Sequence, residues 1–577
     1  MQKIALFPFI VIFCLLCKRT NAQTDSTRAK FADAVIDEIL ADPNPAVGLP
    51  DAEFVEIKNT RGKSINLEGW KLASLSTVSR PFPSFTLPAD SFVIITSSTN
   101  INLFAPFGEV LGISSFPALN NSGTTLSLIS KQDVTIHSVS YSTAWFQNDV
   151  KSNGGWSLEM TDTHNPCTGA NNWKASTDTR GGTPGAKNSV DANNPDNVAP
   201  ALIRAAAVDS IHIVLTFSEP VDSARASIVA NFNISEEVSI PAAAVAIAPS
   251  FTKVQLTLAT PLVNNKIYTI TAENISDCSG NLIQAIKTVR VGLPVAIDSF
   301  DIVINEILFN PKPNSVDFVE IYNRSNKIFN LKDLSIANRS AANVLGSLHP
   351  LTTDDLLLFP GDYFVISENG SLVKQNYTAK NPDNFIDATM PSFPNDEGVV
   401  VLVNDKKEII DELHYSSKWH YALINNEQGI SLERIDYNKA TQNKDNWTSA
   451  ASTAGFGTPS YQNSQFGAVV SAKANIIVSP KTFSPDNDSF EDFTTITYQM
   501  SALGYVANVT IFDAAGRPVK VLAKNATLAL RGSFRWDGTN DKFIKVPAGV
   551  YIVYTEVFNL DGKKKSFKNT VIAAARF

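Results

Sequence analysis

The sequence predicts an all-β protein made of β-sandwich domains in series, and three observations support this prediction. Short runs rich in β-branched and aromatic residues recur throughout the chain, each flanked by Gly, Pro, Asn, Asp or Ser, as in strands bounded by turns. No long stretch has the apolar spacing of an amphipathic helix. A long segment also occurs twice in the same order, which indicates that a whole domain was duplicated.

The predicted strands are short and regularly spaced. Such strands, separated by frequent turn residues, are typical of β-sandwiches rather than of α/β folds. The clearest examples are "SFVIITS" (91–97), "IHIVLTF" (211–217), "VQLTLA" (254–259), "YFVIS" (363–367) and "VYIVYTEVF" (550–558).

Breaks rich in Pro, Asn and Gly divide the chain into modules. They lie at residues 181–200, 291–300 and 457–470, where such dipeptides mark loops and linkers. A chain of 577 residues is too long for one hydrophobic core. The breaks therefore predict four domains, at residues 28–190, 197–293, 299–465 and 472–577, after a leading segment at 1–22.

The first and third of these domains are copies of each other. "DAVIDEILADPNPAVGLPDAEFVEIKN" (33–59) corresponds to "DIVINEILFNPKPNSVDFVEIYN" (301–323). Further on, "GWSLEMTD" corresponds to "GISLERID", "NNWKAS" to "DNWTSA", and "GGTPGAKNS" to "FGTPSYQNS". The order and spacing of these matches indicate one foldable unit that is present twice.

Both copies resemble the lamin tail domain, over residues 33–189 and 301–464. The resemblance rests on the opening "V-I-[DN]-E-I-L", the strand "F-V-E-I-x-N", the following "N-L" and the closing "N-W" and "G-T-P". It implies an Ig-like β-sandwich of a kind also found in secreted bacterial proteins. The chain has no heptad rod, basic tract or C-terminal cysteine box, so filament assembly and chromatin binding are not implied.

The other two domains have resemblances of their own. Residues 198–292, with "VDSIHIVLTFSEPVD" and "YTITAENISDCSGN", resemble a bacterial Ig-like domain of the surface-layer-associated type. Residues 472–577, with "FSPDNDSFEDFTTITYQM" and "VPAGVYIVYTEV", resemble the Ig-like domain of flagellar hook-capping proteins. At the C-terminus of a Bacteroidetes-like protein, such a domain is similar to a sorting domain, which implies the type IX secretion machinery as a partner.

The N-terminus predicts export. Lys3 precedes an apolar run over residues 4–17, and small residues stand at the −3 and −1 positions of a cleavage site between Ala22 and Gln23. This is the pattern of a secretory signal peptide. A lipoprotein signal is the alternative, although two leucines precede the cysteine that would be lipidated. We expect a secreted, extracellular or cell-surface protein with no membrane insertion, since no later run is long and apolar enough for a membrane helix.

The charge of the chain disfavours two classes of partner. The net charge is −8 and becomes −11 without the signal peptide, which holds three basic residues and no acidic one. Binding to nucleic acid rests on clustered Lys and Arg, and binding to anionic membranes has the same requirement. The sequence therefore predicts neither nucleic acid nor a membrane surface as a partner.

Two of the four cysteines remain after cleavage, Cys167 and Cys278. Two are too few for a disulfide framework or a four-ligand zinc site. They lie in different predicted domains. An interdomain disulfide is one expectation for an oxidising compartment, and two buried free thiols are the other.

Each copy holds two glutamates at matching positions. Strict alternation along a strand places Glu38 on one face with Ile36 and Leu40. A carboxylate among apolar neighbours is costly unless it gains hydrogen bonds or a counter-charge. One interpretation is a metal or ligand site in each copy, and the other is carboxylates that cap backbone donors or reach water. A catalytic pair would need a cleft, which favours a structural role. The four residues are Glu38, Glu56, Glu306 and Glu320.

A second acidic cluster lies in the last domain. "PDNDSFED" supplies Asp486, Asp488 and Asp492, and oxygen ligands at alternating loop positions suit calcium. The spacing is not that of an EF-hand, and the loop has no glycine. Turns stabilised by Asp side chains explain the same residues, so calcium is a candidate cofactor with a structural alternative.

Other motifs favour a non-catalytic protein. The histidines lack metal-ligand spacing, and no nucleophile, zinc-hydrolase, phosphate-loop or dinucleotide motif is present. The repeated tryptophans, Trp145 with Trp419 and Trp173 with Trp447, are expected in cores rather than as sugar-stacking platforms. The sequence thus predicts a surface scaffold or adhesin that binds an extracellular protein or glycan. The alternatives are an extracellular hydrolase that uses the repeated glutamates and a calcium-dependent carbohydrate-binding protein.

Overall fold

The computed structural model describes residues 29–235, 238–340, 342–467 and 474–575, so the predicted signal peptide lies outside the described residues. Strands dominate, and the predicted all-β fold of β-sandwiches in series is confirmed. The α-helices of this part are short, α1 (Ile101–Phe104) and α2 (Gly370–Asn376). None of the helices in the described ranges has the length and apolar character needed to cross a membrane.

The first copy (residues 28–190) packs a large sheet against a smaller one. The large sheet has the order β11-β10-β1-β2-β6-β7, and the smaller has the order β4-β8-β9. Apolar residues of both sheets, among them Ile36, Ile57 and Leu126, form the core between them. Each such side chain contributes about 1.5–3 kcal/mol when fully buried. The strands are β1 (Ala34–Leu40), β2 (Phe54–Asn59), β4 (Lys71–Ala73), β6 (Phe92–Ser97), β7 (Val110–Ile113), β8 (Gly123–Ile129), β9 (Thr135–Ser142), β10 (Leu158–Met160) and β11 (Trp173–Ala175).

The second copy (residues 299–465) repeats this arrangement. Its large sheet has the order β26-β25-β20-β19-β29-β30, and its smaller sheet the order β23-β22-β27-β28. Strands β29, β19, β20 and β25 therefore correspond to β10, β1, β2 and β6. The strands are β19 (Ile302–Leu308), β20 (Phe318–Asn323), β22 (Leu334–Ala337), β23 (His349–Pro350), β25 (Tyr363–Ser367), β26 (Phe385–Asp387), β27 (Glu397–Asn404), β28 (Ile409–Ser416), β29 (Leu432–Arg434) and β30 (Trp447–Ser449).

A β-bulge changes the alternation of side chains along the first strand of each copy. In β1 the register shifts between Ile36 and Glu38, and β19 has the same shift. Ile36 and Ile39 therefore both face the core, whereas Leu40 lies in a separate apolar cluster on the other side of the sheet. The expectation that Glu38 shares a face with both Ile36 and Leu40 is wrong for Ile36, because a bulge inserts one extra residue into the strand.

The intervening domain (residues 197–293) and the C-terminal domain (residues 472–577) are also β-sandwiches. The intervening domain pairs β12-β13-β16-β15 with β14-β17-β18, and the C-terminal domain pairs β31-β33-β36 with β32-β38-β37-β34-β35. The strands are β12 (Leu202–Ala207), β13 (His212–Phe217), β14 (Phe232–Ile234), β15 (Ala243–Ile247), β16 (Lys253–Thr257), β17 (Tyr268–Ala272), β18 (Thr288–Val291), β31 (Asn475–Ser479), β32 (Thr482–Phe483), β33 (Thr494–Gln499), β34 (Tyr505–Asp513), β35 (Pro518–Thr527), β36 (Arg531–Trp536), β37 (Gly549–Asn559) and β38 (Lys564–Ala573).

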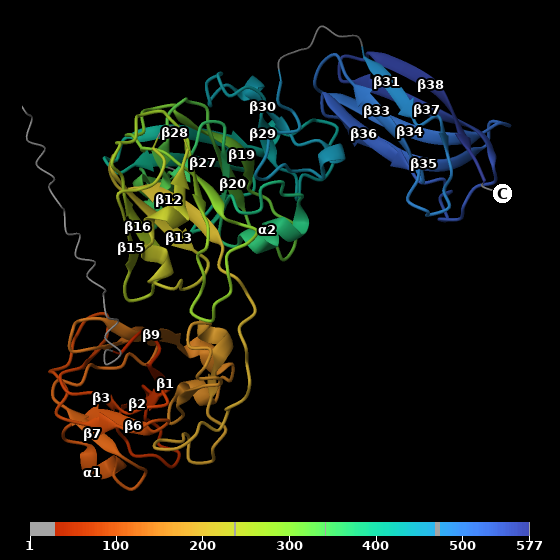
Figure 1. Cartoon of the computed structure of the whole chain (residues 1–577). Helices are drawn as coiled ribbons and strands as arrows, with labels where there is room; N and C mark the ends of the chain where they lie inside the picture. The colour runs from red at the N-terminus through yellow and green to blue at the C-terminus, as the bar shows by residue number, and fades with distance from the viewer. Residues whose placement is uncertain (1–28, 236–237, 341, 468–473, 576–577) are drawn as a thin grey trace, which may run out of the picture.

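The intervening domain shares an apolar core with the second copy. Figure 1 shows these two parts side by side, with the first copy at one end of the molecule and the C-terminal domain at the other. Ile328, Leu357 and Phe359 of the second copy belong to the apolar core of the intervening domain. Because side chains of both parts share one core, this junction is held by burial as well as by surface contacts.

The other two junctions also bring side chains of successive domains into contact. Between the first copy and the intervening domain, the rings of Phe31 and Phe251 meet edge to face at 5.4 Å. Between the second copy and the C-terminal domain, the Ser452 N–H donates to Thr527 Oγ1 over 2.9 Å. Every pair of successive domains is therefore in direct contact.

Candidate functional site

The repeated glutamates lie side by side on neighbouring strands of each large sheet. In the first copy, Glu38 of β1 stands directly opposite Glu56 of β2 on one side and Glu159 of β10 on the other. All three have no exposed surface. We call these three residues the first glutamate row. Glu306, Glu320 and Glu433 are arranged in the same way and form the second glutamate row.

Sequence reasoning missed the third member of each row. Glu159 and Glu433 occupy the same place in "GWSLEMTD" and "GISLERID", so the duplication itself marks them. They face away from the core because the residues on either side of Glu159, Leu158 and Met160, belong to it. A search for every acidic residue common to both copies would have found them.

A loop covers each row and supplies its hydrogen-bond donors. These loops are the first closing segment (181–190, "GGTPGAKNSV") and the second closing segment (456–465, "FGTPSYQNSQ"). The loop approaches the row so closely that a Cβ added at Gly182 would lie 2.6 Å from Glu38 Oε1 and 2.8 Å from Ser157 Oγ. In the first copy, the glycine of "G-T-P" is thus required by the buried carboxyl beneath it.

The first closing segment binds all three carboxyls of its row. The Thr183 N–H donates to Glu38 Oε1 over 2.8 Å, and the Thr183 hydroxyl donates to Glu159 Oε1 over 3.0 Å. The Gly185 N–H donates to Glu56 Oε2. These contacts join a loop to three strands that are distant in sequence.

The second closing segment makes the equivalent contacts. The Thr458 N–H donates to Glu306 Oε1 over 2.9 Å, and its hydroxyl lies 2.8 Å from Glu433 Oε1. The Ser460 N–H donates to Glu320 Oε2 over 2.5 Å. In both copies the row therefore caps backbone donors of the loop that closes the domain.

The two rows differ at the bulge residue that precedes them. In the second copy, Asn305 Nδ2 donates to Glu320 Oε1 over 2.7 Å. Asp37 holds this position in the first copy. Asp37 Oδ1, Glu38 Oε2 and Glu56 Oε1 are buried and find no hydrogen-bond partner among the described residues.

Burial dominates the electrostatics of both rows. Burial, together with repulsion from the neighbouring Glu159 and Glu433, raises the pKa of Glu38 and of Glu306 to about 8. Burial likewise raises the pKa of Glu56 and Glu320 well above the usual range. Carboxyls that are enclosed and favour the neutral form suit neither nucleophilic attack nor metal binding.

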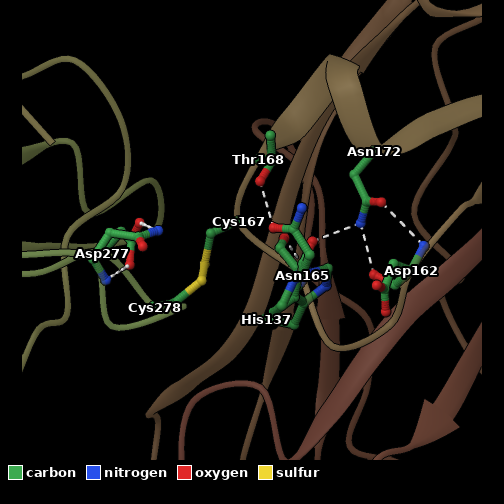
Figure 2. The surroundings of a disulfide bond; sticks show 10 residues. His137, Asp162, Asn165, Cys167, Thr168, Asn172, Asp277 and Cys278 are labelled. Atoms are coloured by element: carbon green, nitrogen blue, oxygen red, sulfur yellow. Dashed lines mark hydrogen bonds between the residues drawn. A yellow bond between two sulfur atoms is a disulfide. The ribbon is translucent and has the colours of Figure 1, made fainter. Parts of the chain in front are cut away.

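The structure joins Cys167 and Cys278 in a disulfide that links the first copy to the intervening domain. Their Cα atoms are 6.3 Å apart, and Figure 2 shows the bond crossing from one domain to the other. Two hydrogen bonds hold the loop before Cys167, because Asn172 Nδ2 donates to the carbonyl groups of Asp162 and Asn165 over 2.7 and 2.6 Å. The disulfide therefore leaves the first copy from a fixed loop.

A cavity of about 440 Å³ lies beside this disulfide, and we call it the junction cavity. Its lining includes the rings of Phe31, Trp145 and Phe251 and the acidic residues Asp196 and Glu219. Burial, and then the repulsion of nearby aspartates, raises the pKa of Glu219 to about 7.

Three acidic residues gather beside the junction cavity, and two of them, Asp196 and Glu219, line it. Carboxylate oxygens of Asp196, Glu219 and Asp277 lie within 4.8 Å of one another. Asp196 comes from the linker before the intervening domain, and Glu219 and Asp277 come from separate segments of that domain, so no local motif in the sequence indicates their proximity.

The acidic loop of the C-terminal domain brings its predicted residues together. Oxygens of Asp486, Asp488 and Asp492 lie within 4.8 Å of one another. Asp492 accepts the N–H groups of Asn487 and Ser489 over 2.5 and 2.9 Å, which is the turn chemistry that competes with calcium. Calcium at this loop stays a prediction, and calorimetry at millimolar calcium tests it.

The repeated tryptophans belong to the cores. Trp173 and Trp447 are 1% and 4% exposed. Trp145 and Trp419 are partly buried and pack against the same cores. The prediction of a core position is confirmed for Trp173 and Trp447, whereas Trp145 packs against its core and also lines the junction cavity.

Comparison with known families finds three matches along the chain. Residues 27–143 and 297–417 match the Lamin Tail Domain, and residues 186–290 match the Bacterial Ig-like domain. No curated protein matches the chain.

Solved structures give matches of low overall similarity. The N-terminal part of the bacterial S-layer protein SbsC is 21% identical, with 29% of this chain and 40% of that chain covered and a TM-score of 0.16. FLGD from P. aeruginosa is 20% identical, with coverages of 18% and 78% and a TM-score of 0.14. A tetra-tandem repeat of a large adhesion protein is 10% identical, with coverages of 94% and 100% and a TM-score of 0.12. Such low TM-scores support no statement about function.

Proposed function

Because the chain contains two lamin tail domains and a bacterial Ig-like domain, we propose that it is a non-catalytic scaffold or adhesin, exported and held at or near the cell surface. Its β-sandwiches present binding surfaces to an extracellular protein or glycan. The enclosure of the repeated glutamates carries this proposal. Glu38, Glu56, Glu306 and Glu320 have no exposed surface, so the most conspicuous repeated acids of the chain serve the fold.

A hydrolase would need a different arrangement of these acids. Hydrolysis by a carboxyl pair requires two carboxyls that face a bound substrate across a cleft. Here the closing segments occupy the place where a substrate would bind, and Thr183 and Thr458 use their N–H groups and hydroxyls to hold the carboxyls. The duplication of the row together with its loop favours a unit that was copied for its fold.

The contacts between domains support a scaffold. The first junction is covalent through Cys167 and Cys278. The second shares an apolar core that includes Ile328 and Phe359. Domains that are fixed in this way hold their outer surfaces at a constant spacing, which suits a protein that bridges a cell surface and a partner.

The C-terminal domain is the proposed sorting or anchoring element, with the type IX secretion machinery as its partner. The motifs of residues 472–577 support this part of the proposal. The Tyr421 hydroxyl donates to the Gly504 carbonyl over 2.7 Å, so the domain is attached to the second copy by polar contacts at its edge. A sorting domain needs such accessibility, because the machinery must bind it first.

Calcium-dependent glycan binding is a second candidate, and the junction cavity favours it. The cavity places Phe31 and Trp145 beside Asp196 and Glu219, which combines aromatic surface with oxygen ligands. Replacement Trp145→Ala is expected to abolish glycan binding if this candidate holds, while Trp419→Ala in the second copy serves as the matched control.

The test is cell fractionation of the full chain and of a chain without residues 472–577, followed by a binding screen on glycans and matrix proteins. The proposal expects the full chain in the surface fraction, loss of this fraction on truncation, and a bound ligand that is not degraded. Retention of both chains inside the cell would contradict export. Hydrolysis of a ligand that disappears in Glu38→Gln would favour the enzyme instead.

A further inference from the structure

We propose that a proton shared between Asp37 and Glu56 holds the first closing segment shut, and that loss of this proton at alkaline pH opens this segment at a lower pH than the second closing segment. The first copy would then contain a pH-sensitive latch that the second copy lacks. This inference does not depend on the proposed function.

Asp37 and Asn305 occupy equivalent places in the two copies. Each is the residue at the bulge of the first strand. The carbonyl group of each accepts a hydrogen bond from an asparagine of the closing segment, from Asn188 Nδ2 over 2.9 Å and from Asn463 Nδ2 over 3.0 Å. The backbone is therefore held in the same way, and the two side chains begin from the same position.

In the second copy, an amide group satisfies the neighbouring carboxyl. Asn305 Nδ2 donates to Glu320 Oε1 and to Asn463 Oδ1, both over 2.7 Å. The amide supplies two N–H donors to acceptors that would otherwise remain unpaired. A neutral donor is thus required at this position.

In the first copy, an ionised carboxylate at the same position has no proton to donate. Asp37 Oδ1 and Glu56 Oε1 are both buried and unpartnered within the part of the chain that the structure describes. A buried polar atom without a partner costs about 1–3 kcal/mol, and more when it is charged. One proton on Asp37 gives it the shape and donor of Asn305 and satisfies both oxygens in a single O–H···O contact.

The charges around the pair favour retention of this proton. Burial raises the pKa of Asp37 well above its usual range, and repulsion from Glu38 adds to it. His137 of β9 adds no positive charge at neutral pH, because burial lowers its pKa to about 4. The charged groups that act on the pair are Glu38 and Glu159, which favour the proton, and Lys58 of β2, which opposes it. Arg180, directly before the closing segment, acts on Glu38.

Deprotonation acts directly on the closing segment. Glu56 accepts the N–H of Gly185, so repulsion between two buried carboxylates strains the contact that holds the loop. An acid with a raised pKa in the closed state binds its proton more tightly there than in the open state. Closure therefore weakens as pH rises. The equilibrium constant for opening of the segment increases by up to about tenfold per pH unit for each proton released.

Hydrogen–deuterium exchange of the full chain between pH 6 and pH 9 tests the latch, after correction for the intrinsic exchange rate. The expected result is that protection of the peptide with Thr183 falls more steeply with pH than protection of the peptide with Thr458, by about one proton, or tenfold per pH unit. Asp37→Asn should bring the first slope to that of the second copy. Asn305→Asp, the reciprocal variant, should steepen the second.

Difference infrared spectroscopy between pH 7 and pH 9 tests the proton itself, and it needs no variant that folds poorly. The carbonyl band of buried protonated carboxyls should be present in the unmodified chain at pH 7 and should be weaker in Asp37→Asn. Equal slopes for the two closing segments, an unchanged slope in Asp37→Asn, or no protonated band at pH 7 would each overturn the proposal.

Discussion

The two lamin tail domains keep the same glutamate row and closing segment but differ in one buried network next to the row. In the second copy, this network consists of Asp411, Arg434 and Thr441. In the first copy, neutral side chains occupy the equivalent positions. The segment "IDE" of the second copy corresponds to "IHS" in the first, and "SLER" corresponds to "SLEM". The glutamate row and the closing segment are thus common to both copies, whereas the buried network beside the row differs between them. In the first copy, His137 is equivalent to Asp411, Met160 to Arg434 and Cys167 to Thr441.

The second copy satisfies a buried backbone group with a charged pair. The Ile304 N–H donates to Asp411 Oδ2 over 2.8 Å, and Arg434 Nη2 lies 3.3 Å from the same oxygen. Thr441 donates its hydroxyl to Asp411 Oδ1 over 2.5 Å. The Arg434 side chain has no exposed surface, so its charge depends on this partner.

The first copy satisfies the same backbone group without charge. The Ile36 N–H donates to His137 Nδ1 over 3.1 Å. A neutral acceptor needs no cation, so Met160 stands where the second copy has an arginine. The position equivalent to Thr441 is then released from the network and holds Cys167, which forms the disulfide to the intervening domain. The backbone donor had to be satisfied in both copies, whereas the charge could be exchanged for a covalent link.

The largest effect is expected from breaking the charged pair of the second copy. Arg434→Met leaves Asp411 buried without its cation and should lower the free energy of unfolding by about 3–5 kcal/mol. The double variant Asp411→His with Arg434→Met copies the first domain and should recover most of this loss.

Chemical denaturation followed by tryptophan fluorescence measures this effect, because Trp447 Nε1 donates to the Thr441 carbonyl over 2.8 Å and so reports on the network. Met160→Arg in the first copy is the reciprocal control and should destabilise, since His137 offers no negative charge. Equal stability of the single and double variants would contradict the claim that the residues at positions 411 and 434 depend on each other.

The next largest effect concerns the covalent link that only the first copy makes to the intervening domain within the described chain. Cys167→Ser with Cys278→Ser opens a bridge between residues 111 apart in sequence and should cost about 2–4 kcal/mol. Differential scanning calorimetry should show a lower transition for the first copy and an unchanged one for the second. A reducing agent should reproduce the shift in the unmodified chain, and an identical melting profile in both forms would count against the link.

A smaller effect should distinguish the two closing segments. Thr458→Val keeps the shape but removes a hydroxyl that lies within 3.1 Å of Glu306 and 2.8 Å of Glu433, at an expected cost of about 1–3 kcal/mol. Thr183→Val removes a hydroxyl whose carboxyl contact is with Glu159 alone among the described residues and should cost less. Thermal unfolding of both variants measures the difference, and a larger loss in Thr183→Val would contradict the proposed contacts.

Much of the fold could be predicted from the sequence because strand composition and turn residues are local properties. The duplication, read across "VIDEIL" and "VINEIL", also predicted that the glutamates matter to the unit. The bulge could not be predicted, because β1 is buried throughout its length and its acidic residues give no alternation to follow. Asp196, Glu219 and Asp277 were missed because they are distant in sequence and only the folded chain brings them together.

The central claim is that the glutamate rows are enclosed parts of the fold, and carboxyl footprinting tests it most directly. The folded full chain is treated with a carbodiimide and an amine, and the modified glutamates are identified by mass spectrometry. The account predicts that all six row residues stay unmodified while exposed Glu68 and Glu397 react. Modification of any row residue in the folded chain as rapidly as Glu68 would show an open acidic cleft and would contradict the account.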